Sequence, residues 1–213
     1  MRSILVLNPK GGSGKTTLAT NIAAYIAGQG KRVALADLDK QGSSNDWLAV
    51  RPDNRPAIIR ACEDSKTVRV EADTDYLIID SPAALHGNKL AKFARNAERA
   101  IVPITASAID VRAAERFFHE LVSLKKKINR KIKIATVANR VREDTRAAAR
   151  LENYLEHLRL PDGRELPYLS RLRNSQNYVT AAERGLGIFE LAPSKTFQDR
   201  EQWVPLLKWL AQH

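Results

Sequence analysis

The chain has 213 residues, of which 44% are hydrophobic, and its formal net charge is +11. This length and apolar content suit a single α/β domain over residues 1–213 and leave little room for a second domain. The one cysteine, Cys62, excludes a disulfide framework, a cysteine-ligated iron–sulfur cluster within one chain and the usual structural zinc sites. The basic excess favours anionic partners such as nucleic acid, acidic lipid or nucleotide phosphates.

Short β-branched runs alternate with longer amphipathic stretches, a pattern typical of a mostly parallel sheet flanked by helices on both faces. Strands are predicted near residues 3–7, 32–36, 76–79, 100–103, 132–138 and 166–169. Helices are predicted near residues 15–27, 88–96, 109–127, 145–158, 175–183 and 200–211. Residues 51–74, rich in Pro, Asp and Arg, are interpreted as a helix and a loop between strands. Because no apolar run is long enough for a signal peptide or a membrane span, we expect a soluble cytoplasmic protein.

The first predicted strand is joined to the first predicted helix by the segment NPKGGSGKTT, residues 8–17. Small residues let the backbone curl so that successive N–H groups point inward, and the helix N-terminus adds its positive end. Lys15 is expected to bridge the β- and γ-phosphates of ATP, and Thr16 to place its hydroxyl on Mg²⁺. A glycine-rich turn without a ligand explains the glycines but not the Lys-Thr pair. The predicted nucleotide-binding residues are therefore Gly11, Gly12, Ser13, Gly14, Lys15, Thr16 and Thr17.

The strict P-loop pattern asks for a glycine where this chain has Pro9, and the match is instead to the deviant form K-G-G-x-G-K-T-T, marked by a second lysine, Lys10. In this loop the chain resembles the ParA/MinD family of deviant Walker ATPases. The resemblance implies that ATP binding closes a homodimer in which Lys10 reaches the partner subunit's phosphates. A cation donated in trans suits two facing triphosphates, which otherwise repel each other.

Two carboxylates, Asp37 and Asp39, follow the second predicted strand, at the sheet edge where open α/β folds bind ligands. If the strand persists through both residues, their side chains share a side. The segment DLDKQGSS resembles the family's D-x-D-P-Q-G-[SN] switch, with Lys40 in place of proline. The resemblance implies that Asp39 is catalytic, because it positions the attacking water, and that Asp37 lies near the Mg²⁺ shell.

Later strand ends supply two further candidates. The apolar run YLIID has the form of a Walker B strand, and Asp80 at its tip is expected to hold Mg²⁺ through water. Ala83 and Ala84 follow where family members usually have Pro or Ala and then Gly. Asn139 resembles the asparagine that the family offers to the adenine base, since an amide presents both a donor and an acceptor. An asparagine at a strand end is also a common turn residue.

Two groups of basic residues are candidates for DNA contact. Arg171 and Arg173, with Arg184 further along, resemble the late region where ParA proteins bear basic residues for sequence-independent DNA binding. The second group consists of Lys125, Lys126, Lys127, Arg130, Lys131 and Lys133. Lysines at a helix C-terminus also simply complement the helix dipole. The chain resembles the short ParA forms without an amino-terminal helix-turn-helix, so sequence-specific base readout is not expected.

The resemblance implies a slow ATPase, stimulated by DNA and by a ParB-like or cargo-adaptor protein, that positions a plasmid, a chromosome or a large protein cargo over the nucleoid. One alternative is a MinD-like membrane-associated ATPase. However, Trp203, Leu206 and Leu210 follow the spacing of a helix packed on its own sheet, so no stable membrane association is expected. The other alternative is a metabolic P-loop ligase of the dethiobiotin-synthetase type, against which the acidic switch and the basic excess argue.

Overall fold

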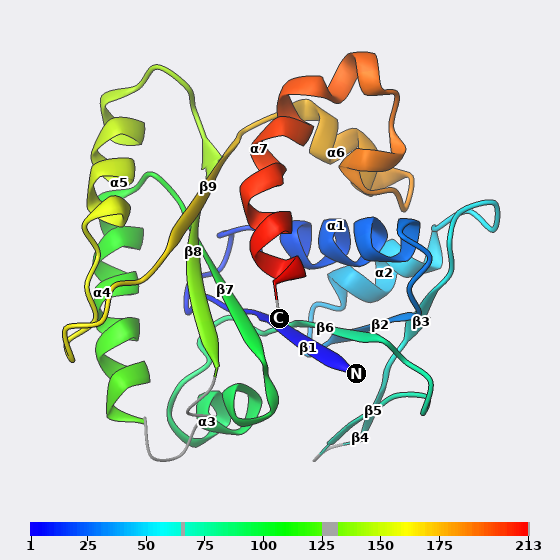
Figure 1. Ribbon diagram of the computed structural model, residues 1–213, viewed down its shortest axis with the longest axis horizontal. Coiled ribbons are helices and arrows are strands. Elements are labelled where there is room, and N and C mark those ends of the chain that lie inside the picture. Colours follow the sequence, from blue (N-terminus) through cyan, green and yellow to red (C-terminus); the bar gives the residue numbers. More distant parts are fainter. Residues whose placement is uncertain (65–66, 125–131, 213) are drawn as a thin grey trace.

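A computed structural model describes residues 1–64, 67–124 and 132–212, and its centre is a sheet of seven parallel strands (Figure 1). The strand order is β3-β2-β6-β1-β7-β8-β9. The bounds are β1 Arg2–Val6, β2 Val33–Asp37, β3 Ile58–Arg60, β6 Tyr76–Asp80, β7 Arg99–Ile104, β8 Lys133–Val141 and β9 Tyr168–Arg173. A separate antiparallel pair is formed by β4, Cys62–Asp64, and β5, Thr67–Arg69. The predicted α/β fold with a parallel sheet is confirmed.

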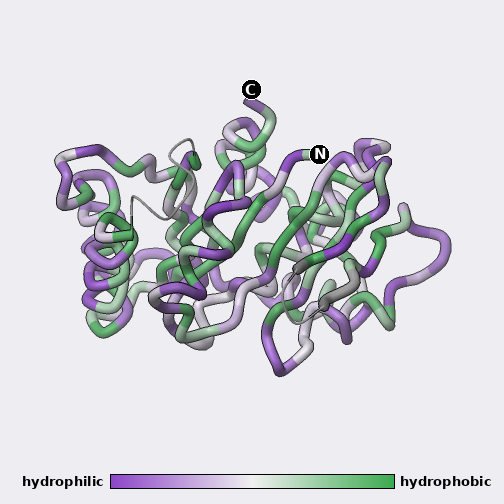
Figure 2. Tube along the Cα trace, turned by 90° about the horizontal axis from the view of Figure 1, so that it is seen from below, coloured by the Kyte–Doolittle hydropathy of each residue, from purple (hydrophilic) through white to green (hydrophobic). Residues whose placement is uncertain are grey.

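Helices cover both faces of the sheet (Figure 1). One layer contains α3 Gly87–Asn96, α4 Ala108–Ser123 and α5 Arg146–Glu156. The opposite layer contains α1 Lys15–Gly28, α2 Ser43–Ala49, α6 Gln176–Glu183, the short 3₁₀ helix η1 Ile188–Glu190 and α7 Pro193–Ala211. Each helical layer packs on one face of the sheet and forms a hydrophobic core with it. Alternate residues of β1 point to opposite faces, so Leu5 packs with the first layer, and Ile4 and Val6 pack with the second. Figure 2 shows these apolar strands running through the interior.

Several local predictions are corrected by the structure. The described part of residues 51–74 contains strands β3, β4 and β5 and no helix, because Ile58 and Ile59 pair with β2 at the edge of the sheet. Helix α2 was not predicted. The last strand runs over residues 168–173 rather than 166–169, since its pairing with β8 extends to Arg173. Helix α7 begins at Pro193 rather than near residue 200, and proline is well suited to a first helical turn.

The parallel topology gathers the candidate residues at one edge of the sheet. All strands of the main sheet point the same way, so the segments that follow β1, β2, β6 and β8 emerge together. Asp37 and Asp80 are direct neighbours in the register of β2 and β6. The fold thus brings the phosphate loop and both acidic strand ends to a common place.

Candidate nucleotide site

The loop between β1 and α1 is held in shape by its own polar groups and by β7. The buried Asn8 donates from Nδ2 to the Pro103 carbonyl at 2.6 Å and accepts the Lys10 N–H at 2.7 Å. The Lys10 carbonyl accepts hydrogen bonds from Ser13 Oγ at 3.2 Å and from Lys15 Nζ at 3.1 Å. The predicted phosphate loop is therefore closed on itself, and its lysine ammonium is held within the loop.

The end of β8 clamps this loop from the other side. Asn139, which is buried, donates from Nδ2 to the Ser13 carbonyl at 2.8 Å, and Arg140 donates to the Gly12 carbonyl at 3.1 Å. Gly14 has a φ of 86°, and a Cβ at this position would lie 2.2 Å from the Asn139 amide nitrogen. A glycine is required there on both counts. The amide that was predicted to contact adenine is engaged with the loop, and its role toward the base stays a prediction.

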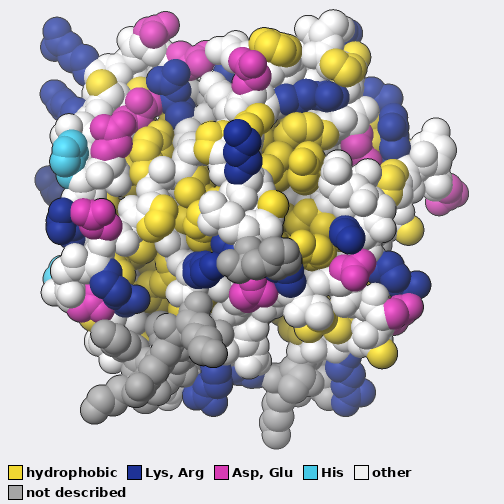
Figure 3. Space-filling view, in the orientation of Figure 1, with side chains coloured by type: hydrophobic (Ala, Val, Ile, Leu, Met, Phe, Trp, Pro, Cys, Tyr) yellow, Lys and Arg dark blue, Asp and Glu magenta, His cyan; other side chains and the backbone are white. Residues whose placement is uncertain are grey.

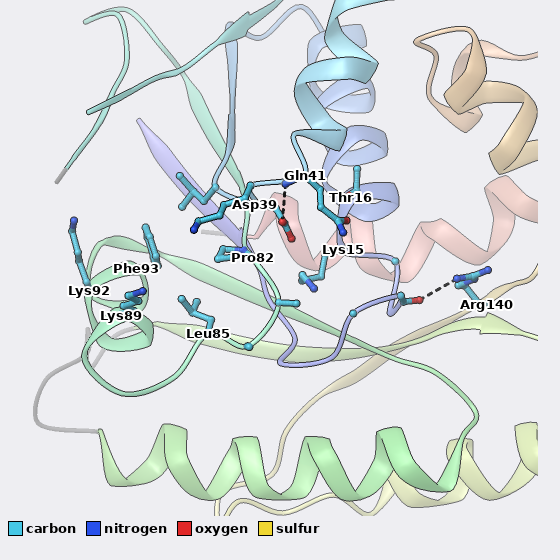
Figure 4. Close-up of a pocket in the computed structure, with 17 residues that line it drawn as sticks. Lys15, Thr16, Asp39, Gln41, Pro82, Leu85, Lys89, Lys92, Phe93 and Arg140 are labelled. Carbon is cyan, nitrogen blue, oxygen red and sulfur yellow. Dashed lines mark hydrogen bonds between the residues drawn. The ribbon is translucent and has the colours of Figure 1, made fainter. Parts of the chain in front are cut away.

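A cavity of about 690 Å³ opens in front of the loop (Figure 4). Its walls come from the phosphate loop, residues 38–41, residues 82–85 and helix α3. A Cβ on Gly11 or Gly12 would meet nothing within 4 Å, so the loop backbone is open to an approaching group. Lys15 is buried at the cavity floor; burial lowers the pKa of this lysine, and the carboxylates of Asp80 and Asp39 oppose that shift. The cavity therefore offers backbone N–H groups and a buried cation to an anionic ligand.

Asp80, the last residue of β6, is 1% exposed. Its Oδ2 accepts hydrogen bonds from Thr16 Oγ1 at 2.7 Å and from Ser44 Oγ at 2.8 Å. Its Oδ1 is buried and has no hydrogen-bond partner among the described residues. Burial raises the pKa of Asp80 to about 6, although the two hydroxyls act in the opposite direction. A buried carboxylate oxygen without a partner beside a threonine hydroxyl is a donor set that suits Mg²⁺ and its waters, so Thr16 and Asp80 fit the predicted metal site.

The two switch aspartates take different positions. Strand β2 ends at Asp37, so Asp39 lies on the following loop and the two side chains do not share a strand face. The carboxylate of Asp37 accepts the N–H groups of Asp39 at 3.1 Å, Ser44 at 2.7 Å and Asn45 at 3.0 Å. Asp39 lines the cavity, and its Oδ1 accepts the Gln41 N–H at 3.1 Å (Figure 4). Asp37 thus holds the switch loop and α2, whereas Asp39 faces the space where a nucleotide would react.

Sequence reasoning did not single out several residues at this site. Ser44 is the last residue of the acidic switch segment, residues 37–44, and Arg140, which has a φ of 54°, directly follows Asn139. Motif context could have drawn attention to both. Lys89, Lys92 and Phe93 of α3 line the far end of the cavity and belong to no recognisable motif (Figure 4).

The arginines predicted to contact DNA lie outside this cavity, and two of them are paired. Arg171 forms an ion pair with Glu152 at 3.1 Å. Arg173 forms one at 2.6 Å with Asp199, which is completely buried. Arg184 is exposed just after α6. Lys and Arg side chains are spread over the face shown in Figure 3. In the second basic group, residues 125–131 lie outside the described residues.

The carboxyl-terminal helix packs on the body of the protein as its spacing predicted. Trp203 and Leu206 are fully buried, and Leu210 is 4% exposed, all within the core that also contains α1. Of the helices in the described part of the chain, none combines the length and apolarity that crossing a bilayer requires. The apolar face of α7 therefore packs in the protein's own interior.

Among the described residues, no three His, Cys, Asp or Glu side chains come together as a metal-binding group.

A parallel sheet whose first strand leads through this loop into a helix, with Asp80 beside Thr16, defines a P-loop nucleotide-binding protein. Residues 4–188 match the family described as the CobQ/CobB/MinD/ParA nucleotide binding domain, and the chain belongs to that family. The resemblance of the loop to ParA/MinD ATPases is thus confirmed.

The chain is similar to named members of this family. It is 26% identical over 195 residues to the maintenance of carboxysome distribution protein A of Halothiobacillus neapolitanus, covering 89% of this chain and 87% of the relative. It is 57% identical over 51 residues to the chromosome-partitioning ATPase Soj of Thermus thermophilus, covering 24% of this chain and 20% of the relative.

Solved structures share the fold. The ATP complex of a Cyanothece McdA variant superposes with a TM-score of 0.70 at 17% identity, covering 97% of this chain and 96% of that one. The MinC:MinD complex of Aquifex aeolicus superposes with a TM-score of 0.69 at 19% identity, covering 99% of this chain and 95% of that one.

Proposed function

We propose that this protein is an ATP-dependent dimerisation switch with slow ATPase activity that positions a large cargo inside the cell. The observation that carries the proposal is the different placement of the two loop lysines. Lys15 is buried and its ammonium is bonded within its own loop, whereas Lys10 is partly exposed. Among the described residues, the Lys10 ammonium has neither a hydrogen bond nor an ion pair. That amine is available to a nucleotide held by a second copy of the chain.

Hydrolysis in such a site depends on positioning and charge neutralisation rather than on covalent catalysis. The loop N–H groups and Lys15 bind and orient the phosphates. Asp39 faces the cavity and orients the attacking water, and Asp37 keeps Asp39 in place by holding the switch loop. Thr16 and Asp80, the latter through water, would hold Mg²⁺, which would further neutralise the phosphate charge when bound. Among the described residues that line the cavity, Asp39 is the only carboxylate able to orient water, which favours a slow reaction suited to a timer.

The nature of the cargo is inferred from the relatives. The relative that spans most of this chain is named for carboxysome distribution, which supports a large protein assembly as cargo. Shorter matches to chromosome-partitioning ATPases support a DNA track and keep plasmid or chromosome cargo in consideration. In this proposal the ATP-bound homodimer binds nucleoid DNA in the cytoplasm. A ParB-like or adaptor protein then stimulates ATP hydrolysis and so releases the dimer from the DNA.

Among the three candidate arginines, Arg184 is the best placed for non-specific DNA contact, because it is exposed. Arg171 and Arg173 form ion pairs with Glu152 and with the buried Asp199. The exposed position of Arg184 after α6 leaves it accessible to a phosphate backbone. A MinD-like role at a membrane has less support, because the buried face of α7 already packs in the core.

The proposal is tested by sedimentation with saturating ATP and Mg²⁺. Asp39→Ala should bind ATP, sediment as a dimer and accumulate on DNA, because it closes without hydrolysing. Lys10→Ala should bind ATP and remain a monomer, and Lys15→Ala should lose ATP binding. Lys31→Ala, an exposed lysine just before β2 at the opposite edge of the sheet, is the control and should dimerise like the parent. A monomeric Asp39→Ala protein under these conditions would refute the proposal.

A further inference from the structure

Ser44 is a completely buried serine whose hydroxyl points away from its own helix. It belongs to the first turn of α2, yet its Oγ donates to Asp80 Oδ2, 36 residues further along the chain, at 2.8 Å. The first N–H groups of α2 are capped instead by Asp37, whose Oδ2 accepts those of Ser44 and Asn45. The Ser44 hydroxyl therefore bonds to Asp80 at the end of β6 rather than to a group of its own helix.

The same carboxylate oxygen also receives the hydroxyl of Thr16, at 2.7 Å. Two hydroxyl groups, one from α1 and one from α2, thus converge on a single oxygen of Asp80. The other oxygen, Oδ1, is buried and has no partner among the described residues. An ionised carboxylate that keeps one buried oxygen unpaired is costly, unless a cation or an ordered water binds there. The arrangement orients Asp80 so that this oxygen stays free for such a ligand.

Ser44 also connects this carboxylate to the switch loop. The Ser44 N–H donates to Asp37 Oδ2 at 2.7 Å, so one residue is bonded to the acids at the ends of both β2 and β6. These two strand ends are adjacent in the sheet. The start of α2 is consequently tied to the metal-binding carboxylate on one side and to the switch aspartate on the other.

We propose that Ser44 is a positioning residue of the magnesium site, which acts through Asp80 and couples binding of the metal to the order of helix α2. This inference rests on the proposed function only in that the cavity binds ATP with Mg²⁺. When Oδ1 of Asp80 engages the hydrated ion, the carboxylate is fixed, and the Ser44 hydroxyl transmits that constraint to α2. Removal of the hydroxyl leaves Asp80 less well oriented and α2 insensitive to the metal.

The test compares Ser44→Ala with Ser43→Ala, an exposed serine in the same helical turn. Both are made in the Asp39→Ala background, so that ATP is not consumed. Mg²⁺ is titrated into the ATP-loaded protein by calorimetry, and ATP affinity is measured separately in EDTA. Ser44→Ala should weaken Mg²⁺ binding roughly tenfold, as loss of a supporting hydrogen bond at a metal site commonly does, with ATP affinity in EDTA unchanged. Ser43→Ala should match the background protein in both measurements.

Hydrogen exchange of the α2 amides supplies a second readout. Mg²⁺ should slow exchange over α2 in the ATP-loaded background protein and in Ser43→Ala, but not in Ser44→Ala. The proposal is overturned if Ser44→Ala retains both the Mg²⁺ affinity and the metal-dependent protection. It is equally overturned if ATP affinity in EDTA falls in parallel with Mg²⁺ affinity, because Ser44 is then only a packing residue. Failure of the background protein to bind ATP at all would instead refute the proposed function.

Discussion

Gly14 offers a direct test of how the phosphate loop is built, because two independent constraints meet at this residue. Its φ of 86° is left-handed, which costs an L-residue about 1–2 kcal/mol. In Gly14→Ala the new Cβ would also lie 2.2 Å from the Asn139 amide nitrogen, so that side chain must move and release the Ser13 carbonyl. Loss of this hydrogen bond adds about 1 kcal/mol. We therefore expect the free energy of unfolding to fall by about 2–3 kcal/mol.

Urea denaturation of the nucleotide-free protein measures this loss. Gly28→Ala is the matched control, because it changes a glycine at the other end of the same helix, where a Cβ meets nothing within 4 Å. That control should be neutral or stabilised by up to about 1 kcal/mol. Adding Asn139→Ala to Gly14→Ala removes the clash, so the double variant should lose less stability than the two single changes combined. Full stability in Gly14→Ala, or strict additivity in the double variant, would contradict this account of the loop.

Three further predictions follow from the buried charges. Burial raises the pKa of Asp80 to about 6, and Mg²⁺ requires the ionised carboxylate, so the Mg²⁺ affinity of the ATP complex should fall about tenfold from pH 7 to pH 5. Asp80→Asn should abolish most of this pH dependence. An Mg²⁺ affinity that does not change with pH in the parent protein would contradict the prediction. Arg173→Ala should lower the free energy of unfolding in urea by about 2–3 kcal/mol, because the fully buried Asp199 then loses its cation and keeps only the hydrogen bonds from Asn177 and Ser175. An unchanged midpoint would show that this ion pair does not stabilise the fold. Glu190→Ala should lower the free energy of unfolding by about 3–5 kcal/mol, because the Arg51 side chain, which is 5% exposed, loses its carboxylate partner. An unchanged melting temperature in calorimetry would disprove this prediction.

Local patterns in the sequence were sufficient to predict six strands of the main sheet and the phosphate loop. The strands near residues 3–7, 76–79 and 100–103 are almost wholly apolar because both faces of the sheet are covered, and they form β1, β6 and β7. The loop is recognisable because close approach of phosphate to backbone demands particular residue types at fixed spacing. Asp80 was found for the same reason, as one acid at the tip of a buried strand.

The edge strand β3 and the hairpin of β4 and β5 were missed, since a three-residue strand carries almost no periodic signal and forms only beside a partner. The tertiary structure also decided how the polar side chains are used. Asn139 and Ser13 are 126 residues apart, and Ser44 and Asp80 are 36 apart. Arg173 pairs with Asp199, although its neighbours in the chain suggested a DNA contact. Spacing along a chain specifies which side chains share a face of one element, but a hydrogen bond between two elements depends on how those elements pack. The sequence alone therefore determined which residues could bind a nucleotide, and only the packing of the sheet and helices decided which of them hold one another in place.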